Sequence, residues 1–213
     1  MTLMSYLKTF SYLVLAVGIS SATAGSFEDF FIAIRNDDPG ALSALFQRGF
    51  DPNTVNEKSQ PGLTVAMQQR SLKAAALLLQ QPSVKIDALN QAGESALMMS
   101  ALKGDKVGAK MLLERGAKIN QIGWSALHYA ATGPEPELVR LLLDRGAEID
   151  AASPNGTTPL MMASQYGSED SVKLLLDRGA DPNRRNQRDL RAADFAKLAG
   201  REQLAARLQK LQR

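Results

Sequence analysis

A repeated pattern of apolar residues constrains the fold of this chain more than any other feature. Equivalent apolar positions recur through most of the 213 residues with spacings of 33, 34, 30, 33 and 33 residues. Repeat periods of roughly 20 to 50 residues are typical of solenoids, in which each unit buries its apolar face only against its neighbours. The positions are Phe30, Leu63, Leu97, Leu127, Leu160 and Ala193.

One unit, Gly123–Ala147, shows how the pattern predicts two helices joined by a turn. Ser125 supplies a hydroxyl that can cap the first helix, and Pro136 suits the first turn of the second helix. The leucine-rich run at 138–143 predicts a second helix that is apolar nearly all round. Gly146 follows, at the position where a left-handed residue commonly ends a helix. Neither helix is long enough to bury its apolar residues alone.

The fifth unit carries the most regular version of the pattern. It reads GTTPLMMA at 156–163, then Gly167, then VKLLLDRGADPN at 172–183. This resembles the ankyrin repeat, and the resemblance covers Ser26 to Arg213. Units three and four keep the pattern with Ser-Ala-Leu in place of Thr-Pro-Leu, whereas units one, two and six depart from it further. The resemblance implies an all-α ankyrin-repeat solenoid of about six stacked helix pairs with short hairpin loops. The expected units are 26–55, 56–89, 90–119, 120–152, 153–185 and 186–213.

The two ends of the array differ in charge. From Arg184 onward there are nine basic and three acidic residues, whereas Gly25 to Asn183 contains 15 basic and 19 acidic residues. Terminal repeats need polar outer faces because each lacks one neighbour. The basic last unit is therefore either a solvated cap or a surface that binds an acidic protein, an anionic surface or nucleic acid. Aromatic residues do not alternate with its arginines, which disfavours nucleic acid.

The first 24 residues predict a targeting segment. Lys8 precedes an apolar run at 9–20, and Ala22-Thr23-Ala24 is a small-residue pattern that a signal peptidase accepts. The run is shorter than the roughly 20 residues that a spanning helix needs. We expect a signal peptide at 1–24 and cleavage after Ala24, with the ankyrin-repeat domain at 25–213 in the periplasm or secreted. An uncleaved membrane anchor is the alternative.

The residues that often carry catalysis or bind metals are scarce. The chain has no cysteine and one histidine, His128, with no nucleophile or carboxylate at a catalytic spacing. The resemblance implies that this imidazole is structural and hydrogen-bonds backbone between adjacent units. Asp87, Asp150 and Asp181 recur after the second helices and are interpreted as turn-forming residues. We therefore expect no enzyme activity, no cofactor and no metal site.

The hairpin before the fourth unit is short. Seven residues separate Ile119 from Leu127, whereas ten separate Ile149 from Leu160. The row of hairpins should therefore have a notch at this unit. The only tryptophan, Trp124, lies in this segment. It is expected near a hairpin tip, either available to a partner or folded back over its own shortened turn.

The resemblance also implies where a partner would bind, because ankyrin repeats usually use hairpin tips and the inner face of the first helices. The expected partner-binding residues are Gln91, Glu94, Leu102 and Lys103 of unit three, Ile122, Trp124 and Thr132 of unit four, and Asn155, Thr157, Gln165 and Tyr166 of unit five.

The chain is similar to small exported bacterial ankyrin-repeat proteins, which implies a protein-binding module of the cell envelope. The expected partner is a protein, with no nucleic acid, no stable membrane anchor after cleavage, and a monomeric state. Two alternatives remain open. One is a structural adaptor that docks through its basic last unit, and the other is a hydrolase with no recognisable motif.

Overall fold

The computed structural model describes residues 21–211, and within them the chain forms twelve α-helices arranged as six consecutive pairs. The first helices of the pairs are α2 (Ser21–Arg35), α4 (Gly62–Gln69), α6 (Ala96–Leu102), α8 (Ala126–Thr132), α10 (Pro159–Tyr166) and α12 (Ala192–Leu198). The second helices are α3 (Pro39–Gln47), α5 (Leu72–Gln80), α7 (Lys106–Glu114), α9 (Pro136–Asp144), α11 (Glu169–Asp177) and α13 (Glu202–Lys210).

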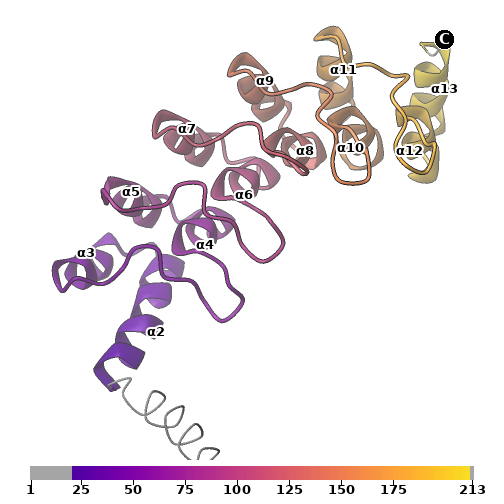
Figure 1. The fold of residues 1–213 in the computed structure, drawn as a ribbon. Coiled ribbons are helices and arrows are strands. Elements are labelled where there is room, and N and C mark those ends of the chain that lie inside the picture. Colours follow the sequence, from indigo (N-terminus) through magenta and orange to yellow (C-terminus); the bar gives the residue numbers. More distant parts are fainter. Residues whose placement is uncertain (1–20, 212–213) are drawn as a thin grey trace, which may run out of the picture.

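The pairs stack side by side into a curved array. Figure 1 shows the first helices and the hairpin loops on the concave side and the second helices on the convex side. Among the described residues, none of the helices is long and apolar enough to cross a membrane. The predicted signal segment up to residue 20 lies outside the described residues, and the predicted cleavage position after Ala24 falls within the range of α2. Export and cleavage stay predictions.

The helices begin and end at the residues that the repeat pattern predicts. Thr158 precedes α10 and its hydroxyl accepts a hydrogen bond from the backbone N–H of Met161 at 3.4 Å, while Pro159 opens the helix. Ser125 precedes α8 and Pro136 opens α9. Gly146 follows the end of α9 with φ of +90°, a left-handed conformation that costs little only for glycine.

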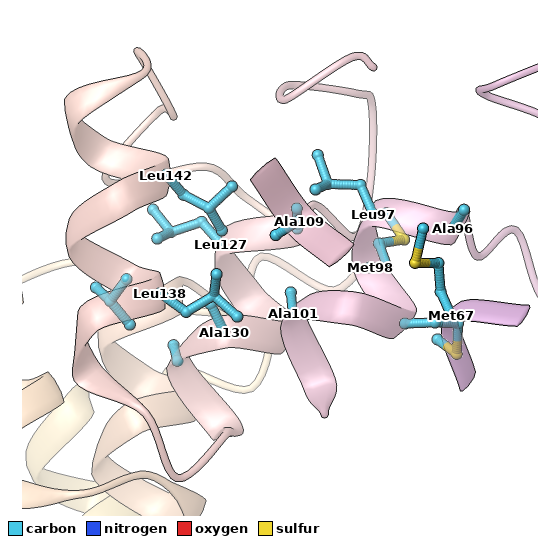
Figure 2. Packing of buried hydrophobic residues seen from close by; sticks show 14 of the residues in the cluster. Met67, Ala96, Leu97, Met98, Ala101, Ala109, Leu127, Ala130, Leu138 and Leu142 are labelled. Carbon is cyan, nitrogen blue, oxygen red and sulfur yellow. The ribbon is translucent and has the colours of Figure 1, made fainter. Parts of the chain in front are cut away.

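The core runs continuously along the array. All six equivalent positions from Phe30 to Ala193 are buried, with exposed fractions of 2% or less. Figure 2 shows Leu127 and Ala130 of α8 packed between Leu138 and Leu142 of α9 and the preceding unit. Small residues such as Ala130 let neighbouring first helices approach closely, which explains the alanine-rich composition. Each unit therefore depends on its neighbours for burial.

The prediction that the second helix of unit four is apolar nearly all round is wrong. Leu138, Val139 and Leu142 are buried, but Glu137 and Arg140 are exposed and form a pair at 3.3 Å. Leu141 and Leu143, at the edges of the buried face, are half-buried, and they made the helix look apolar all round in the sequence. The helix is amphipathic, with its charged face toward solvent.

Asparagine and aspartate side chains link the loops of successive units. In each case a side-chain oxygen accepts a hydrogen bond from a backbone N–H of the next loop, so the link repeats along the array. The pairs are Asn53 with Lys85 at 2.7 Å, Asp87 with Lys118 at 2.8 Å, Asn120 with Glu148 at 2.9 Å, and Asp150 with Asp181 at 3.1 Å. Asp181 does form its own turn, through the N–H of Asn183 at 2.8 Å. Asp87 and Asp150 also lie in turns, which are closed by Ala88 N–H to the Lys85 carbonyl at 3.1 Å and by Ala151 N–H to the Glu148 carbonyl at 3.2 Å. The turn-forming interpretation is therefore confirmed, and the side chains of these two residues join units in addition.

Candidate functional site

The hairpin that precedes α8 is shorter than the others, as predicted. Eleven residues connect α7 to α8, whereas fourteen connect α9 to α10 and fifteen connect α5 to α6. Ile122 lies at the tip of the short hairpin and its side chain is fully exposed. The missing residues leave a notch in the row of hairpins.

The longer hairpins share a closure that fixes their tips. At Asn90, the backbone N–H donates to the carbonyl of Glu94 at 3.0 Å, and the side-chain oxygen accepts from the N–H of Glu94 at 2.9 Å. Ser153 closes the hairpin before α10 in the same way with Thr157. In the short hairpin, the segment from Gln121 to Trp124 takes the place of this closed loop.

Trp124 lies at the base of the short hairpin, immediately before Ser125, whose hydroxyl contacts Nδ1 of His128 at 2.9 Å. Its ring is half-buried and packs edge-on against His128, with ring centroids 5.2 Å apart and an interplanar angle of 78°. Of the two alternatives for this residue, the structure has the tryptophan folded back onto its own unit. Ile122, not Trp124, occupies the tip.

His128 is a buried structural residue, as predicted. Its Nδ1 accepts from the backbone N–H of Ser125 at 3.2 Å, so Nε2 carries the proton and donates to the carbonyl of Thr157 at 2.9 Å. This bond joins unit four to the hairpin of unit five. Burial lowers the pKa of His128, although hydrogen bonds to backbone oppose that shift. Thr157 itself is only 2% exposed, so its side chain is not available to a partner and its prediction as a binding residue is wrong.

A pocket of 280 Å³ opens on the concave side between α6, α8 and α10. Three aromatic side chains and two long apolar ones supply most of its lining. Tyr129 is fixed in place because its hydroxyl donates to Oε1 of Glu94 at 2.8 Å, across to the preceding hairpin. Burial raises the pKa of Tyr129, and the neighbouring Glu94 raises it further. The lining residues are Leu102, Trp124, His128, Tyr129, Thr132, Met162 and Tyr166.

The first helices around this pocket carry no charge. No Asp, Glu, Lys or Arg occurs within α4, α6, α8 or α10. The charged residue nearest to the end of α6 is Lys103, which is exposed. The pocket is therefore lined by side chains without formal charge, and the carboxylate of Glu94 is bonded to the hydroxyl of the lining residue Tyr129.

Four of the predicted binding residues come together in this pocket: Leu102, Trp124, Thr132 and Tyr166. The others lie outside it. Gln91, Lys103, Ile122 and Asn155 are exposed, and Glu94 and Gln165 are partly buried.

Sequence reasoning missed two lining residues, Tyr129 and Met162. Each lies two positions after the equivalent leucine of its unit, at Leu127 and Leu160. That shared register places both on the concave side. The repeat alignment contained this signal, but neither residue was predicted to contact a partner.

The basic last unit uses several of its arginines internally. The guanidinium of Arg201 donates to the carbonyls of Ala163, Ser164 and Gly167 at the end of α10, at 3.1, 3.0 and 2.9 Å. Arg207 pairs with Glu169, but both side chains are more than half exposed, so Arg201 is the stronger link between the last unit and the array.

Comparison with known proteins agrees with this architecture. A family model described as ankyrin repeats (3 copies) matches residues 30–122 and 119–186, which is most of the chain. A solved structure of a predatory endopeptidase from Bdellovibrio bacteriovorus in complex with an immunity protein contains a chain with the same fold. That match has a TM-score of 0.74 and 24% sequence identity, and it covers 85% of this chain and 97% of the other. Members of this family are typically non-enzymatic and bind other proteins. This chain therefore belongs to the ankyrin-repeat family and is a protein–protein interaction module.

Proposed function

We propose that this protein binds a partner protein on its concave face, with an apolar side chain of the partner inserted into the pocket between α6, α8 and α10. One observation carries the proposal: Trp124, Tyr129 and Tyr166 line a neutral pocket of 280 Å³ on the side where the first helices have no charge. Tryptophan and tyrosine are enriched among residues that dominate binding energies.

The chemistry of the pocket selects an apolar side chain. Full burial of a Leu, Ile, Phe or Met side chain contributes about 1.5–3 kcal/mol, which is enough to make the pocket the centre of an interface. Tyr166, 62% exposed, forms part of the outer rim and can bond to partner backbone through its hydroxyl.

We also propose a cellular location and an oligomeric state for the protein. The A-x-A pattern ending at Ala24 supports export and cleavage, which would leave a monomeric protein in the periplasm or outside the cell. The proposed role is non-enzymatic. His128 supports this, because both ring nitrogens are already used in hydrogen bonds to Ser125 and Thr157.

The partner class that we favour is an exported enzyme. The structural neighbour comes from a complex of an immunity protein with an endopeptidase, and the shared fold makes a similar restraining role reasonable for this chain. Docking of the whole basic last unit on an acidic surface is less well supported, because the guanidinium of Arg201 is already bound to three carbonyls of the array.

The test is affinity capture from envelope extracts with the mature protein. The double variant Trp124→Ala, Tyr166→Ala should fail to recover a protein that the unchanged chain recovers. Val107→Ala is the matched control, because Val107 is 57% exposed on the convex helix α7 and should not affect recovery. Equal recovery by the double variant and the control would exclude the pocket as the binding site.

A further inference from the structure

A second groove lies on the convex side, between the last two second helices, α11 and α13. Its volume of 890 Å³ exceeds that of the concave pocket, and it is separate from it. Apolar residues of both helices line it, but Val172, Leu204 and Leu208 are at most 3% exposed. Its open apolar surface therefore comes mainly from Leu176, which is partly buried, and from Leu211 at the end of α13, which is 50% exposed. The apolar floor residues are Val172, Leu176, Leu204, Leu208 and Leu211.

The groove exists because α13 is attached to the array mainly through α12. Helix α12 packs against α10, and Arg201 fixes the start of α13 to the carbonyls at the end of α10. Helices α9 and α11, in contrast, pack against each other and are joined by Arg178 and Asp144 at 2.6 Å. Figure 1 shows α13 standing apart from α11. The pair Arg207–Glu169 spans the groove, but both side chains are more than half exposed and contribute little to holding it closed.

The two walls of the groove have opposite charge. The charged lining residues on α11 are Glu169, Asp170, Lys173 and Asp177, which together carry a net negative charge. Those on α13 are Arg207 and Lys210, which are both positive. All of these side chains are exposed. An apolar floor between an acidic wall and a basic wall is a specific chemical pattern.

We propose that this groove binds an amphipathic α-helix of a partner protein. The apolar stripe of that helix lies on the leucine floor, its basic flank faces α11 and its acidic flank faces α13. A groove between two helices of nine residues each has the length of about two to three helical turns. A helix turned end for end exchanges its flanks, so the wall charges also set the direction in which the helix binds. The proposal is independent of the concave pocket.

Three synthetic peptides of roughly 14 residues, about four helical turns, test the proposal. They share one leucine stripe and differ only in their flanks: Lys on one and Glu on the other, Glu on both, or Lys on both. Fluorescence anisotropy with the mature protein measures their affinities. The mixed peptide should bind roughly tenfold more tightly than either uniform peptide, because only it pairs with both walls.

Charge reversal of one wall sharpens the test. The double variant Arg207→Glu, Lys210→Glu makes both walls acidic, so the Lys-flanked peptide should replace the mixed one as the tightest binder. Arg184→Glu with Arg188→Glu changes the net charge equally at exposed positions outside the groove and should preserve the original order. Leu211→Asp should weaken all three peptides. Absent binding, equal binding of the three peptides, or an order that does not change on reversal would overturn the proposal.

Discussion

Units four and five show how one repeat plan produces two different local surfaces. In unit five, a closed hairpin of full length presents polar residues. The residue after its equivalent leucine is Met161, whose sulfur lies 3.4 Å from the backbone nitrogen of Thr158. In unit four, the hairpin is three residues shorter, and His128 at the same position bonds to Ser125 and to the next unit. The short hairpin leaves Trp124 folded onto the helices, where it lines the pocket.

The pocket lies beside the shortest of the hairpins between units, on the inner face of α6, α8 and α10. At the base of the short hairpin, the rings of Trp124 and Tyr129 form part of the pocket wall. The histidine restores part of the rigidity that the missing closure would provide, through its bond to the carbonyl of Thr157. Stability and binding are thus linked in unit four more closely than in unit five.

The largest expected effect on stability distinguishes the turn between α10 and α11, at Gly167, from the turn between α8 and α9, at Gly133. A Cβ added at Gly167 would lie 2.1 Å from the carbonyl oxygen of Ala131, whereas one added at Gly133 would lie 3.2 Å from that of Ala101. Gly167→Ala should therefore destabilise the array by about 3 kcal/mol or more, and Gly133→Ala by about 1 kcal/mol. Urea unfolding followed by circular dichroism measures both, and a larger cost at Gly133 would contradict the packing of these units.

The second effect concerns the link between units four and five. His128→Met gives unit four the residue of unit five and removes the hydrogen bond between the units, which should cost about 1 kcal/mol because the carbonyl of Thr157 keeps the N–H of Ser153 as a donor. His128→Ala also leaves a cavity and should cost about 3 kcal/mol. Met161→Leu, which removes no inter-unit bond, is the control and should cost less than His128→Met. Equal costs for His128→Met and the control would show that the link does not stabilise the array.

The third effect is a dependence on pH that only unit four should produce. Because burial lowers the pKa of His128 in the folded protein, the unfolded chain binds a proton first as pH falls. Stability should therefore be fully present above the ordinary histidine pKa of about 6.5 and should decrease below it, by at most about 1.4 kcal/mol per pH unit. Unfolding at pH 7.5 and pH 5.5 measures this, and His128→Met should remove that part of the loss. An unchanged difference in the variant would assign the effect to other groups.

The smallest expected effect on stability compares the tip of the short hairpin, Ile122, with its base, Trp124. Ile122 is fully exposed, so Ile122→Ser should change stability by no more than about 0.5 kcal/mol. Trp124→Ser removes a half-buried ring packed on His128 and should cost more than that. Thermal unfolding of the two variants is the measurement. A greater loss at Ile122 would mean that the isoleucine, not the tryptophan, packs onto the unit.

Much of the fold was predictable because the repeat constrains burial at every period. The six equivalent positions, the capping residues and the shortened hairpin all follow from sequence spacing, since each helix pair must bury the same face against the next. The hydrogen bonds that the side chains of Asp87 and Asp150 make to the next unit were not predictable in the same way. Their partners lie in the next unit, and a distance of about 30 residues along the chain is invisible to local turn rules.

The candidate site was only partly predictable. The inner-face register identified Leu102 and Thr132, five residues after Leu97 and Leu127, and Tyr166, six residues after Leu160. The side-chain direction of Trp124 depends on the space left by three absent residues, which sequence spacing alone does not fix. Thr157 was misplaced because its role lies in its backbone carbonyl, which the residue type does not reveal.

The most direct test of the central claim is site-specific photo-crosslinking from the pocket. A photoreactive phenylalanine analogue at Tyr166, which is 62% exposed at the pocket rim, should crosslink to one partner protein when the chain is expressed in its own cell envelope. The same analogue at Val107 on the convex side should not. Crosslinks of equal yield and identity from both positions, or a partner captured only from Val107, would contradict the claim that the concave pocket is the binding site.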